Sequence, residues 1–372
     1  MKRFAIISCN INCNFTNYGS ALQTYALQTA INRIAPTEFE SIVLDYCPDT
    51  IKGKDIRNPL NHMWDTDEVS QRMCRLTLPA IRSNADKFDR FYNRYYKMGG
   101  VKYGSNNLNE SKLNEALDGY IIGSDTVFCI DEFGFDKGYY ADFPEMQDCS
   151  VSYAASFGDS HFSEEKYKKL NSKLRNFKAL GIREEKYIPY IKEHSNVPVS
   201  KTIDPTLLLK AVDYEVITAQ PESRKPYLLM YARRYNPKME KYARKVAADN
   251  GWDVVEISLR ATNCDYGHDM RYDAGVEEFL ALVKNAEMVI TNSFHGLIFS
   301  VQFRRPFIVF SRESADNKIQ ELLELFGIHD RMFVTGDELE PLPIDYDSVH
   351  ARIDEARAES MEFLKKELTE YI

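Results

Sequence analysis

The residues best suited to chemistry in this sequence lie in the stretch 291–296, Thr-Asn-Ser-Phe-His-Gly. An apolar run at 288–290 precedes it and another apolar run follows, which predicts a strand, a tight turn and a helix. His295 would then stand in the first helical turn, where open α/β folds bind ligands and where unpartnered amides attract anions. The competing interpretation is that Asn292 and Ser293 cap a core helix and that His295 is an ordinary half-buried histidine.

Four more predicted strands end in polar or charged residues. They span 4–8, 119–123, 150–155 and 180–182. The loop after the first strand ends in a glycine, which lets the backbone turn tightly before a helix predicted at 18–34. The carboxyl end of a strand is the position at which such sheets bind ligands. The residues concerned are Asn17, Gly19, Ser124, Asp125, Ser156 and Arg183.

Strands and helices alternate twice along the chain. The second series has strands at 227–231, 253–257, 288–290 and 307–310, with helices at 237–249, 276–285 and 317–326. This alternation predicts an α/β protein with two Rossmann-like doubly wound domains that face a cleft, in a GT-B-like arrangement. We expect the domains at 1–204, with a helical insertion at about 48–115, and at 205–345. A charged helix at 346–372 is a candidate to return to the first domain.

Composition narrows the class of protein. The 372 residues are 44% apolar and 28% charged, and the formal charge of −9 argues against general affinity for nucleic acid or anionic membranes. A site for an anionic substrate must therefore be built locally from a few cations. No stretch is long enough to span a bilayer, and the apolar part of the N-terminus is too short for a signal peptide.

The cysteines and the aromatic residues have ordinary explanations. Seven scattered cysteines without a CxxC pair predict a reduced cytoplasmic protein without a disulfide framework or a zinc site. No cluster has metal-ligand spacing, so we expect no metal, and we expect no cofactor. Cys9 and Cys13 near a strand end are better explained as buried thiols than as nucleophiles. A helix predicted at 85–96 is crowded with aromatic side chains, for which packing is the favoured use and a sugar-binding surface the alternative.

Taken together and in this order, the motifs resemble the polysaccharide pyruvyl transferase family, over residues from about 17 to about 331. The resemblance implies two Rossmann domains similar to those of GT-B glycosyltransferases, with the active site between them. It also implies transfer of pyruvate from phosphoenolpyruvate to a sugar of a cell-surface polysaccharide, free or lipid-linked, which gives a ketal and phosphate. The motifs are Asn17-Tyr18-Gly19, Leu22-Gln23, Tyr25-Ala26-Leu27, Gly123-Ser124-Asp125, Ser152 to Gly158, Arg183-Glu184-Glu185, Asp204 to Leu208 and Thr291 to Gly296.

Ketal formation from an enol phosphate requires a proton on the methylene carbon, after which a sugar hydroxyl attacks the adjacent cationic carbon. The family has an important histidine at the position of His295, and a histidine suits the role of general acid because its ordinary pKa lies near neutrality. A helix N-terminus disfavours an imidazolium, whereas a bound phosphate and carboxylate favour it, so binding of the donor would arm the acid. Asp125 is a candidate base for the hydroxyl, with a helix cap as the alternative role.

The donor carries two anionic groups, which require cations or oriented amides in a cleft poor in water. The family has an important arginine at the position of Arg183, whose planar fork matches a carboxylate or a phosphate. The alternative for Arg183 is a surface salt bridge with Glu184 or Glu185, which would contribute little energy.

Many family members carry a further arginine two residues before the histidine, where this chain has Ser293. Another cation must then take its place. Lys318, at the start of the predicted helix 317–326, and Arg233, just after the strand 227–231, are the candidates, and a solvated face is the alternative for each. The residues expected to position ligand groups rather than to react are Asn17, Gly19, Ser124, Ser156, Asn292 and Ser293.

Two other functions fit the same predicted architecture. One is a glycosyltransferase that uses a nucleotide sugar, although the second half lacks a convincing pair of a basic residue and a downstream carboxylate for diphosphate and ribose. The other is a carbohydrate-binding protein without catalysis. The fold alone cannot separate these functions from pyruvyl transfer.

Overall fold

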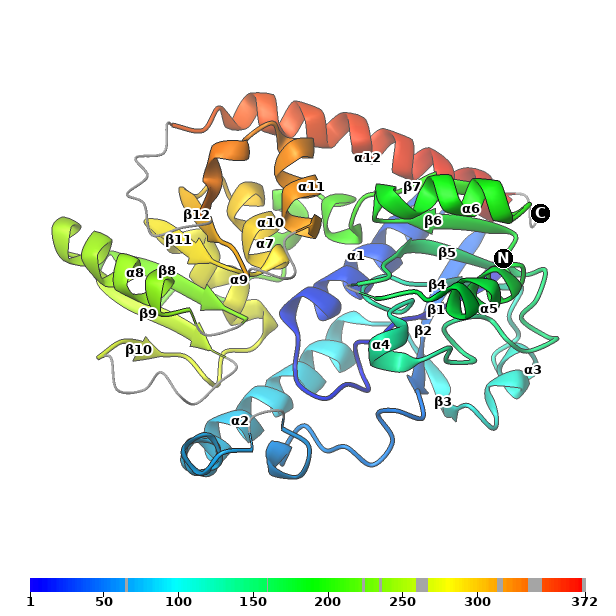
Figure 1. Ribbon diagram of the computed structural model, residues 1–372, viewed down its shortest axis with the longest axis horizontal. Coiled ribbons are helices and arrows are strands. Elements are labelled where there is room, and N and C mark those ends of the chain that lie inside the picture. The colour runs from blue at the N-terminus through cyan, green and yellow to red at the C-terminus, as the bar shows by residue number, and fades with distance from the viewer. Residues whose placement is uncertain are drawn as a thin grey trace. The chain divides into compact units, whose positions relative to one another are not determined.

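The computed structural model describes residues 1–63, 66–158, 160–222, 225–233, 236–258, 267–312, 317–333 and 343–369. The chain divides into two compact units. Unit 1 comprises Met1–Lys54, Tyr92–Leu209 and Asp354–Ile372, and unit 2 comprises Asp55–Phe91 and Lys210–Ile353. Each unit contains one parallel sheet with interleaved helices, so the predicted α/β class is confirmed (Figure 1). The boundaries predicted after residues 204 and 345 stay predictions.

Unit 1 holds a parallel sheet of seven strands in the order β3-β2-β1-β4-β5-β6-β7. The strands β4, β5 and β6 are buried along their whole length, as expected of parallel strands covered on both faces. The order of strands along the chain reverses between β1 and β4, which pair directly. The strands are β1 (Lys2–Ile7), β2 (Phe39–Cys47), β3 (Met98–Gly104), β4 (Gly119–Ile122), β5 (Ser150–Ala155), β6 (Ala179–Ile182) and β7 (Val199–Lys201).

The first helix of unit 1, α1 (Tyr18–Ile34), has the bounds predicted from the sequence. Asn17 caps it, because its side-chain oxygen accepts a hydrogen bond from the amide of Gly19 at 3.0 Å. The other helical segments that lie wholly in unit 1 are η2 (Leu108–Glu110), α3 (Ser111–Asn114), α4 (Ile130–Phe133), α5 (Glu164–Leu174), η3 (Glu185–Tyr187), α6 (Ile188–His194) and η4 (Pro205–Leu207).

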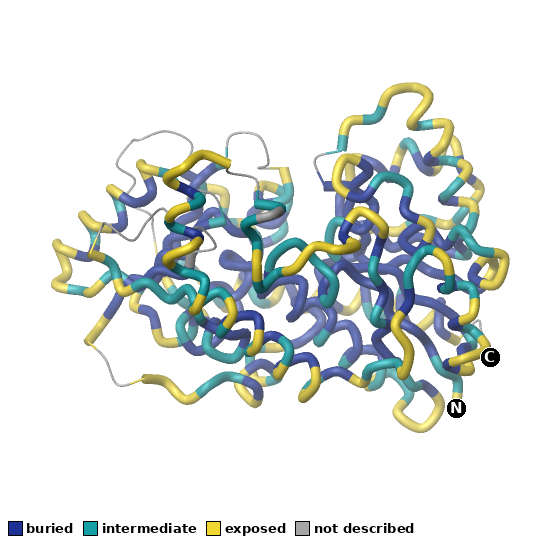
Figure 2. Tube along the Cα trace, turned by 90° about the horizontal axis from the view of Figure 1, so that it is seen from below, coloured by how far each residue is buried: buried dark blue, intermediate teal, exposed yellow. Residues whose placement is uncertain are grey.

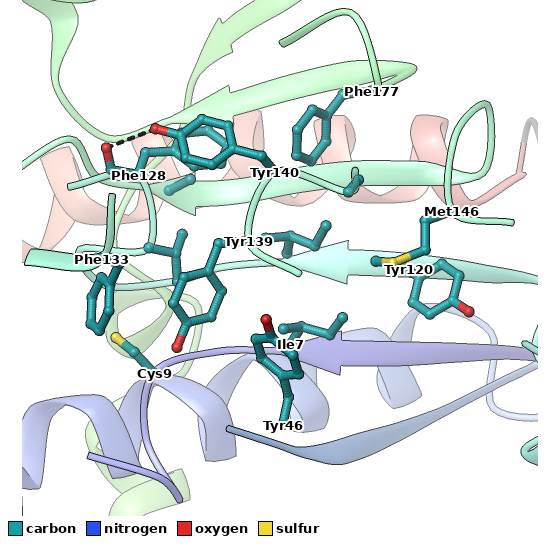
Figure 3. Packing of buried hydrophobic residues seen from close by; sticks show 14 of the residues in the cluster. Ile7, Cys9, Tyr46, Tyr120, Phe128, Phe133, Tyr139, Tyr140, Met146 and Phe177 are labelled. Carbon is teal, nitrogen blue, oxygen red and sulfur yellow. Dashed lines mark hydrogen bonds between the residues drawn. The ribbon is translucent and has the colours of Figure 1, made fainter. Parts of the chain in front are cut away.

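The core of unit 1 is unusually aromatic (Figure 3). The rings of Phe128 and Tyr140 stack with centroids 4.9 Å apart, and the hydroxyl of Tyr140 donates to the carbonyl of Phe128 at 3.0 Å. The hydroxyl of Tyr46 donates to the buried carboxylate of Asp136 at 2.7 Å. Aromatic residues remove large apolar areas from water while their polar ends find hydrogen-bond partners.

Unit 2 holds a parallel sheet of six strands in the order β10-β9-β8-β11-β12-β13, and its strand order reverses between β8 and β11. The strands are β8 (Tyr227–Ala232), β9 (Asp253–Ser258), β10 (Asp269–Met270), β11 (Met288–Thr291), β12 (Phe307–Phe310) and β13 (Met332–Phe333). The helical segments are η1 (Pro59–Asn61), α7 (Ala211–Glu215), α8 (Pro237–Asn250), α9 (Val276–Asn285), α10 (Phe294–Gln302), α11 (Asn317–Phe326) and η6 (His329–Arg331). The helices α2 (Glu68–Tyr95) and α12 (Tyr346–Thr369) each contribute residues to both units.

Burial settles how the aromatic helix is used. Residues 85–95 of the predicted helix 85–96 form the end of the longer helix α2. Phe88, Phe91 and Tyr92 are buried in it, and so is Tyr96, the residue that follows it. Packing, the favoured interpretation, is therefore confirmed for these four side chains. Figure 2 shows the same pattern throughout, with buried residues inside each unit and exposed residues in loops and on outer helix faces.

The strands that the sequence did not reveal lie at or near the ends of the sheets. β3 reads Met-Gly-Gly-Val-Lys-Tyr-Gly, and only its tyrosine is buried. β7 has three residues, none of them buried. An edge strand pairs on one side only and needs no continuous apolar run, so its sequence carries little of the pattern by which central strands are recognised.

Candidate active site

The predicted residues of the first half gather at one edge of the unit 1 sheet. β1, β4, β5 and β6 are neighbours and parallel, so their carboxyl ends meet at the same edge. α1 follows β1, and Ser124, Ser156 and Arg183 stand just beyond the ends of β4, β5 and β6. The hydroxyl of Ser20 donates to the carboxylate of Asp125, which joins the two sides of the point where the strand order reverses. Open α/β sheets bind ligands at this point.

A tight turn after β4 presents Ser124 and Asp125. The amide of Asp125 donates to the hydroxyl of Ser124 at 2.6 Å, and the Asp125 carboxylate accepts from the amide of Thr126 at 3.0 Å. Gly123 enters this turn with φ +131°, and a Cβ there would lie 2.2 Å from the carbonyl oxygen of Tyr153. The position therefore requires glycine for two independent reasons, its backbone angle and the approach of β5.

Replacing Gly123 with alanine is expected to lower the free energy of unfolding by about 3 kcal/mol or more, because backbone strain adds to a clash with a strand that cannot move aside. The control is Gly53→Ala in the same unit, where φ is +81° and nothing lies within 4 Å of the added Cβ. That variant should lose only about 1–2 kcal/mol from strain. Equal losses in urea unfolding of the two variants would show that the close approach has no energetic weight.

Arg183 lies in a buried ion pair. Its side chain is 9% exposed, and Nη1 donates to Oδ2 of Asp204 at 2.8 Å. Asp204 is held in turn by the amide of Thr206 at 3.0 Å, the hydroxyl of Thr206 at 2.6 Å and the side-chain amide of Gln23. Burial alone would lower the pKa of Arg183, but the carboxylates of Asp204, Glu184 and Asp125 outweigh it and raise the pKa. The guanidinium is thus a fixed cation within electrostatic range of Asp125.

The alternative of a surface salt bridge for Arg183 is wrong, because the side chain is 9% exposed and pairs with the buried Asp204. Glu185 pairs with Lys201 at 2.6 Å. Glu184 is buried, and its carboxylate accepts from the hydroxyl of Ser156 and from the amide of Phe157 at 3.3 Å. Ser156 therefore positions Glu184.

The second group of predicted residues gathers at the carboxyl ends of β8 and β11, which pair with Thr291 opposite Tyr231. Asn292 is 1% exposed, and its side-chain oxygen accepts from the amide of Arg233 at 2.7 Å. The hydroxyl of Thr291 donates to the carbonyl of Tyr231 at 2.7 Å. These contacts tie the two loops together at the point where the strand order of unit 2 reverses, the ligand position of such a sheet.

His295 is the second residue of α10, in the first turn as predicted, and it is 8% exposed. Ser293 caps the helix, because its hydroxyl accepts from the amide of Gly296 at 3.3 Å. The rings of Phe294 and His295 meet edge to face with centroids 5.2 Å apart. The capping interpretation is thus confirmed for Ser293. Asn292 ties Arg233 in place instead.

Tyr231 is a member of this group that the sequence did not reveal. Burial raises the pKa of its phenol, and the charge of Arg233 and hydrogen bonds with Ser293 and Arg233 oppose that rise. The phenol thus joins the predicted Ser293 and Arg233. As the fifth residue of a buried strand, Tyr231 had no signal to distinguish it from a core aromatic.

The remaining predicted cation, Lys318, is the second residue of α11, which follows β12, the neighbour of β11. Arg312, two residues beyond β12, comes to the same edge and was not considered from the sequence. In unit 1 the residue that the sequence did not reveal as part of the site is Asp204. It was noted only as part of a motif and as the predicted end of the first domain. It is buried inside the unit and orients Arg183.

Cys9 is a core residue. Its thiol lies among Phe133, Tyr139 and other members of the aromatic cluster (Figure 3), and burial raises its pKa well above the ordinary value. The interpretation of this thiol as buried rather than nucleophilic fits both observations. Cys264 lies outside the described residues. Within the part of the chain that is described, no group of three or more acidic, histidine or cysteine residues could hold a metal ion, and no helix is long and apolar enough to cross a membrane.

The fold matches that of known sugar-nucleotide enzymes. A putative UDP-N-acetylglucosamine 2-epimerase from Listeria monocytogenes aligns with a TM-score of 0.53 and 12% identity over 97% of this chain and 90% of that one. The UDP-GlcNAc 2-epimerase from Methanocaldococcus jannaschii aligns with a TM-score of 0.53 and 10% identity over 95% and 92%. MnaA of S. aureus, in its co-structure with UDP, aligns with a TM-score of 0.50 and 14% identity over 99% and 90%. At such identities the likeness shows a shared GT-B-like fold.

A family model assigns the chain more specifically than the fold does. Residues 17–314 match the family model of polysaccharide pyruvyl transferase, and the chain belongs to that family of transferases. The match spans every residue placed at the two sheet edges above except Lys318. A search of curated proteins finds no match to this sequence.

Proposed function

We propose that this protein transfers pyruvate from phosphoenolpyruvate to hydroxyl groups of a polysaccharide or of its precursor, forming a ketal and releasing phosphate. The observation that supports this most directly is the placement of the family motifs. In each unit they stand at the carboxyl edge of the sheet, around the point where the strand order reverses. Residues that serve folding alone would not be expected to gather at the ligand positions of both sheets.

The reaction needs an acid, a base and anion-binding groups. A proton added to the methylene carbon of the donor makes a methyl group and leaves positive charge on the adjacent carbon. A sugar hydroxyl attacks that carbon and gives up its proton. The carbon–oxygen bond to phosphate then breaks, and a second hydroxyl of the same sugar takes the place of phosphate. Its proton goes to the released phosphate. No oxidant or reductant is consumed.

We assign the roles by chemistry and position. His295 is the general acid, since it is a titratable group in the first turn of α10, where a bound anion is also favoured. Arg183 binds an anionic group of the donor, because its guanidinium is fixed by Asp204. Asp125 receives the proton of the hydroxyl, since it is half-buried and tethered by Ser20.

Arg233 supplies the second cation in the place of the arginine that many family members carry at the position of Ser293. Its backbone amide is fixed by Asn292, and hydrogen bonds of Tyr231 with Ser293 and Arg233 link the three side chains. Lys318 and Arg312 come to the same edge of the sheet from β12 and α11. They are the next candidates should replacement of Arg233 leave donor binding unchanged.

The test is phosphate release from phosphoenolpyruvate in the presence of galactosyl and N-acetylhexosaminyl acceptors. We expect release that depends on the acceptor, and a new methyl signal of the ketal in the proton spectrum of the sugar. UDP-sugars are the parallel arm, compared by the rise in unfolding temperature that each ligand produces. Stabilisation by UDP-sugars alone would overturn the proposal in favour of a glycosyltransferase. Binding of saccharide without phosphate release by any acceptor would favour a carbohydrate-binding protein.

A further inference from the structure

A second cluster of basic residues lies at the opposite edge of the unit 2 sheet. Arg304 and Arg305 come just before β12, and Arg331 comes just before β13, its neighbour in the sheet. These arginines therefore stand at the amino ends of two adjacent parallel strands. His295 and Arg233, by contrast, follow the carboxyl ends of β11 and β8. The basic cluster is thus separate from the candidate active site.

Arg331 is buried, and few hydrogen bonds or ion pairs from the residues that the structure describes offset the cost of burying its charge. Its side chain is 6% exposed, and its Nε lies 3.6 Å from the carboxylate of Asp330, beyond hydrogen-bonding distance. Within the described part of the chain, this buried Nε has no hydrogen-bond partner. Burial lowers the pKa of Arg331, and the nearby Asp330 offsets only part of that effect. Buried guanidinium groups are normally paired, because leaving one without partners is costly.

The other two arginines lie near Tyr346, as Arg331 does. The hydroxyl of Tyr346 donates to the carbonyl of Arg305, and it lies within electrostatic range of Arg331, Arg305 and Arg304. The side chain of Arg305 donates to the carbonyl oxygens of Phe303 and Ala286, not to a carboxylate.

The charges of this cluster do not balance. Arg304 pairs with Asp347 at 2.8 Å, but the Asp347 side chain is 84% exposed. The Asp330 side chain is 51% exposed. Among the described residues, three guanidinium groups thus meet two carboxylates that are both well solvated, which leaves the buried Arg331 as the positive centre of the cluster.

We propose that Arg331, with Arg304 and Arg305, forms a binding site for a small oxyanion of the phosphate class. A guanidinium offers planar, paired donors that match phosphate oxygens, and a partly desolvated site strengthens the attraction. The phenol of Tyr346 contributes by holding Arg305, since its hydroxyl donates to the Arg305 carbonyl. A soluble ion or a phosphate monoester fits an arginine this deeply buried, because each presents a compact terminal phosphate. This proposal does not depend on pyruvyl transfer.

The test measures phosphate binding to the full chain by titration calorimetry at constant ionic strength. Wild-type protein is expected to bind inorganic phosphate, and Arg331→Gln to weaken the binding at this site by about tenfold or more, the loss of a hydrogen bond to a charged group. The matched control is Arg271→Gln, elsewhere in unit 2, whose guanidinium is engaged with Asp269 and Glu222. Its affinity for phosphate should be that of wild type.

A stability measurement, a substitute variant and a comparison of two ligands complete the test. Removing an uncompensated buried charge should leave the unliganded Arg331→Gln protein at least as stable as wild type. If that variant fails to fold, the double variant Arg304→Gln/Arg305→Gln replaces it, with the same expected loss of binding. Tighter binding of glucose 1-phosphate than of inorganic phosphate would identify an ester as the natural ligand, and the reverse would identify the free ion.

An unchanged phosphate affinity in Arg331→Gln, or no phosphate binding by wild type, would overturn this site. Arg331→Gln should still release phosphate from phosphoenolpyruvate at the wild-type rate, because Arg331 is not part of the candidate active site. The two proposals therefore fail separately: loss of phosphate binding is scored on this variant, and loss of turnover on variants of the carboxyl edge.

Discussion

Replacing His295 with glutamine is expected to lower the turnover number for phosphate release by about 10²- to 10⁴-fold, the usual contribution of a positioned general acid. Glutamine can keep polar contacts at this nearly buried position but cannot deliver a proton. Binding of phosphoenolpyruvate should change far less, because the amides of α10 and the cations remain. Initial rates of phosphate release, with the dissociation constant of the donor measured separately, check both parts of this prediction.

His350→Gln is the matched control. His350 is partly buried in α12, and its Nε2 lies 3.1 Å from the carbonyl oxygen of Val301, so the same substitution is made in the same unit away from the sheet edge. It should leave the turnover number near that of wild type. Undiminished turnover in His295→Gln would remove the acid role.

The sequence predicted the edges of the sheets better than the contacts made there. The carboxyl ends of parallel strands share an edge whatever the exact register, so locating β1, β4, β5 and β6 was enough to bring Asn17, Asp125, Ser156 and Arg183 to one place. The bounds of the helices α1, α9 and α11 were also predicted correctly from the sequence. Each begins at or beside a capping or turn residue and carries a regular apolar stripe.

The partners of the charged side chains could not be predicted from the sequence in the same way. Glu184 and Glu185 adjoin Arg183 in sequence, yet the guanidinium pairs with Asp204, 21 residues away. Successive side chains after a strand point in different directions, whereas the chain returns through β7 to bring the aspartate alongside. Tyr231 was hidden for a related reason, since a buried strand tyrosine looks like core until its hydroxyl is placed.

The sequence also did not reveal to which of the two units residues 55–91 belong. Asn84 and Lys87, in α2, contact Ala274, Asp273 and Glu278 about 190 positions later, and residues 55–91 accordingly belong to unit 2. The sequence predicted a helix only at 85–96 in this region, and the helical pattern carries no information on which sheet the helix covers. That choice depends on surface complementarity between residues distant in sequence.

Replacing Arg183 with methionine is expected to lower the free energy of unfolding by about 3–5 kcal/mol, because the Asp204 carboxylate stays buried without its guanidinium. Hydrogen bonds from Gln23 and Thr206 remain and keep the loss from being larger. Activity should vanish as well, but the single variant cannot say whether folding or donor binding was lost.

The double variant Arg183→Met/Asp204→Asn separates the two effects. A neutral amide at position 204 removes the buried charge, and Gln23, whose Oε1 has no hydrogen-bond partner among the described residues, can turn its amide over to accept from it. Unfolding in urea should then show that the double variant has regained most of the free energy of unfolding that Arg183→Met lost. If Arg183 binds the donor, the KM for phosphoenolpyruvate nonetheless stays raised by about tenfold or more, the loss of a charge-assisted contact. A stable double variant with the wild-type KM would make the Arg183–Asp204 pair a structural element, and the donor's anions would have to be met by Arg233, Arg312 or Lys318 instead.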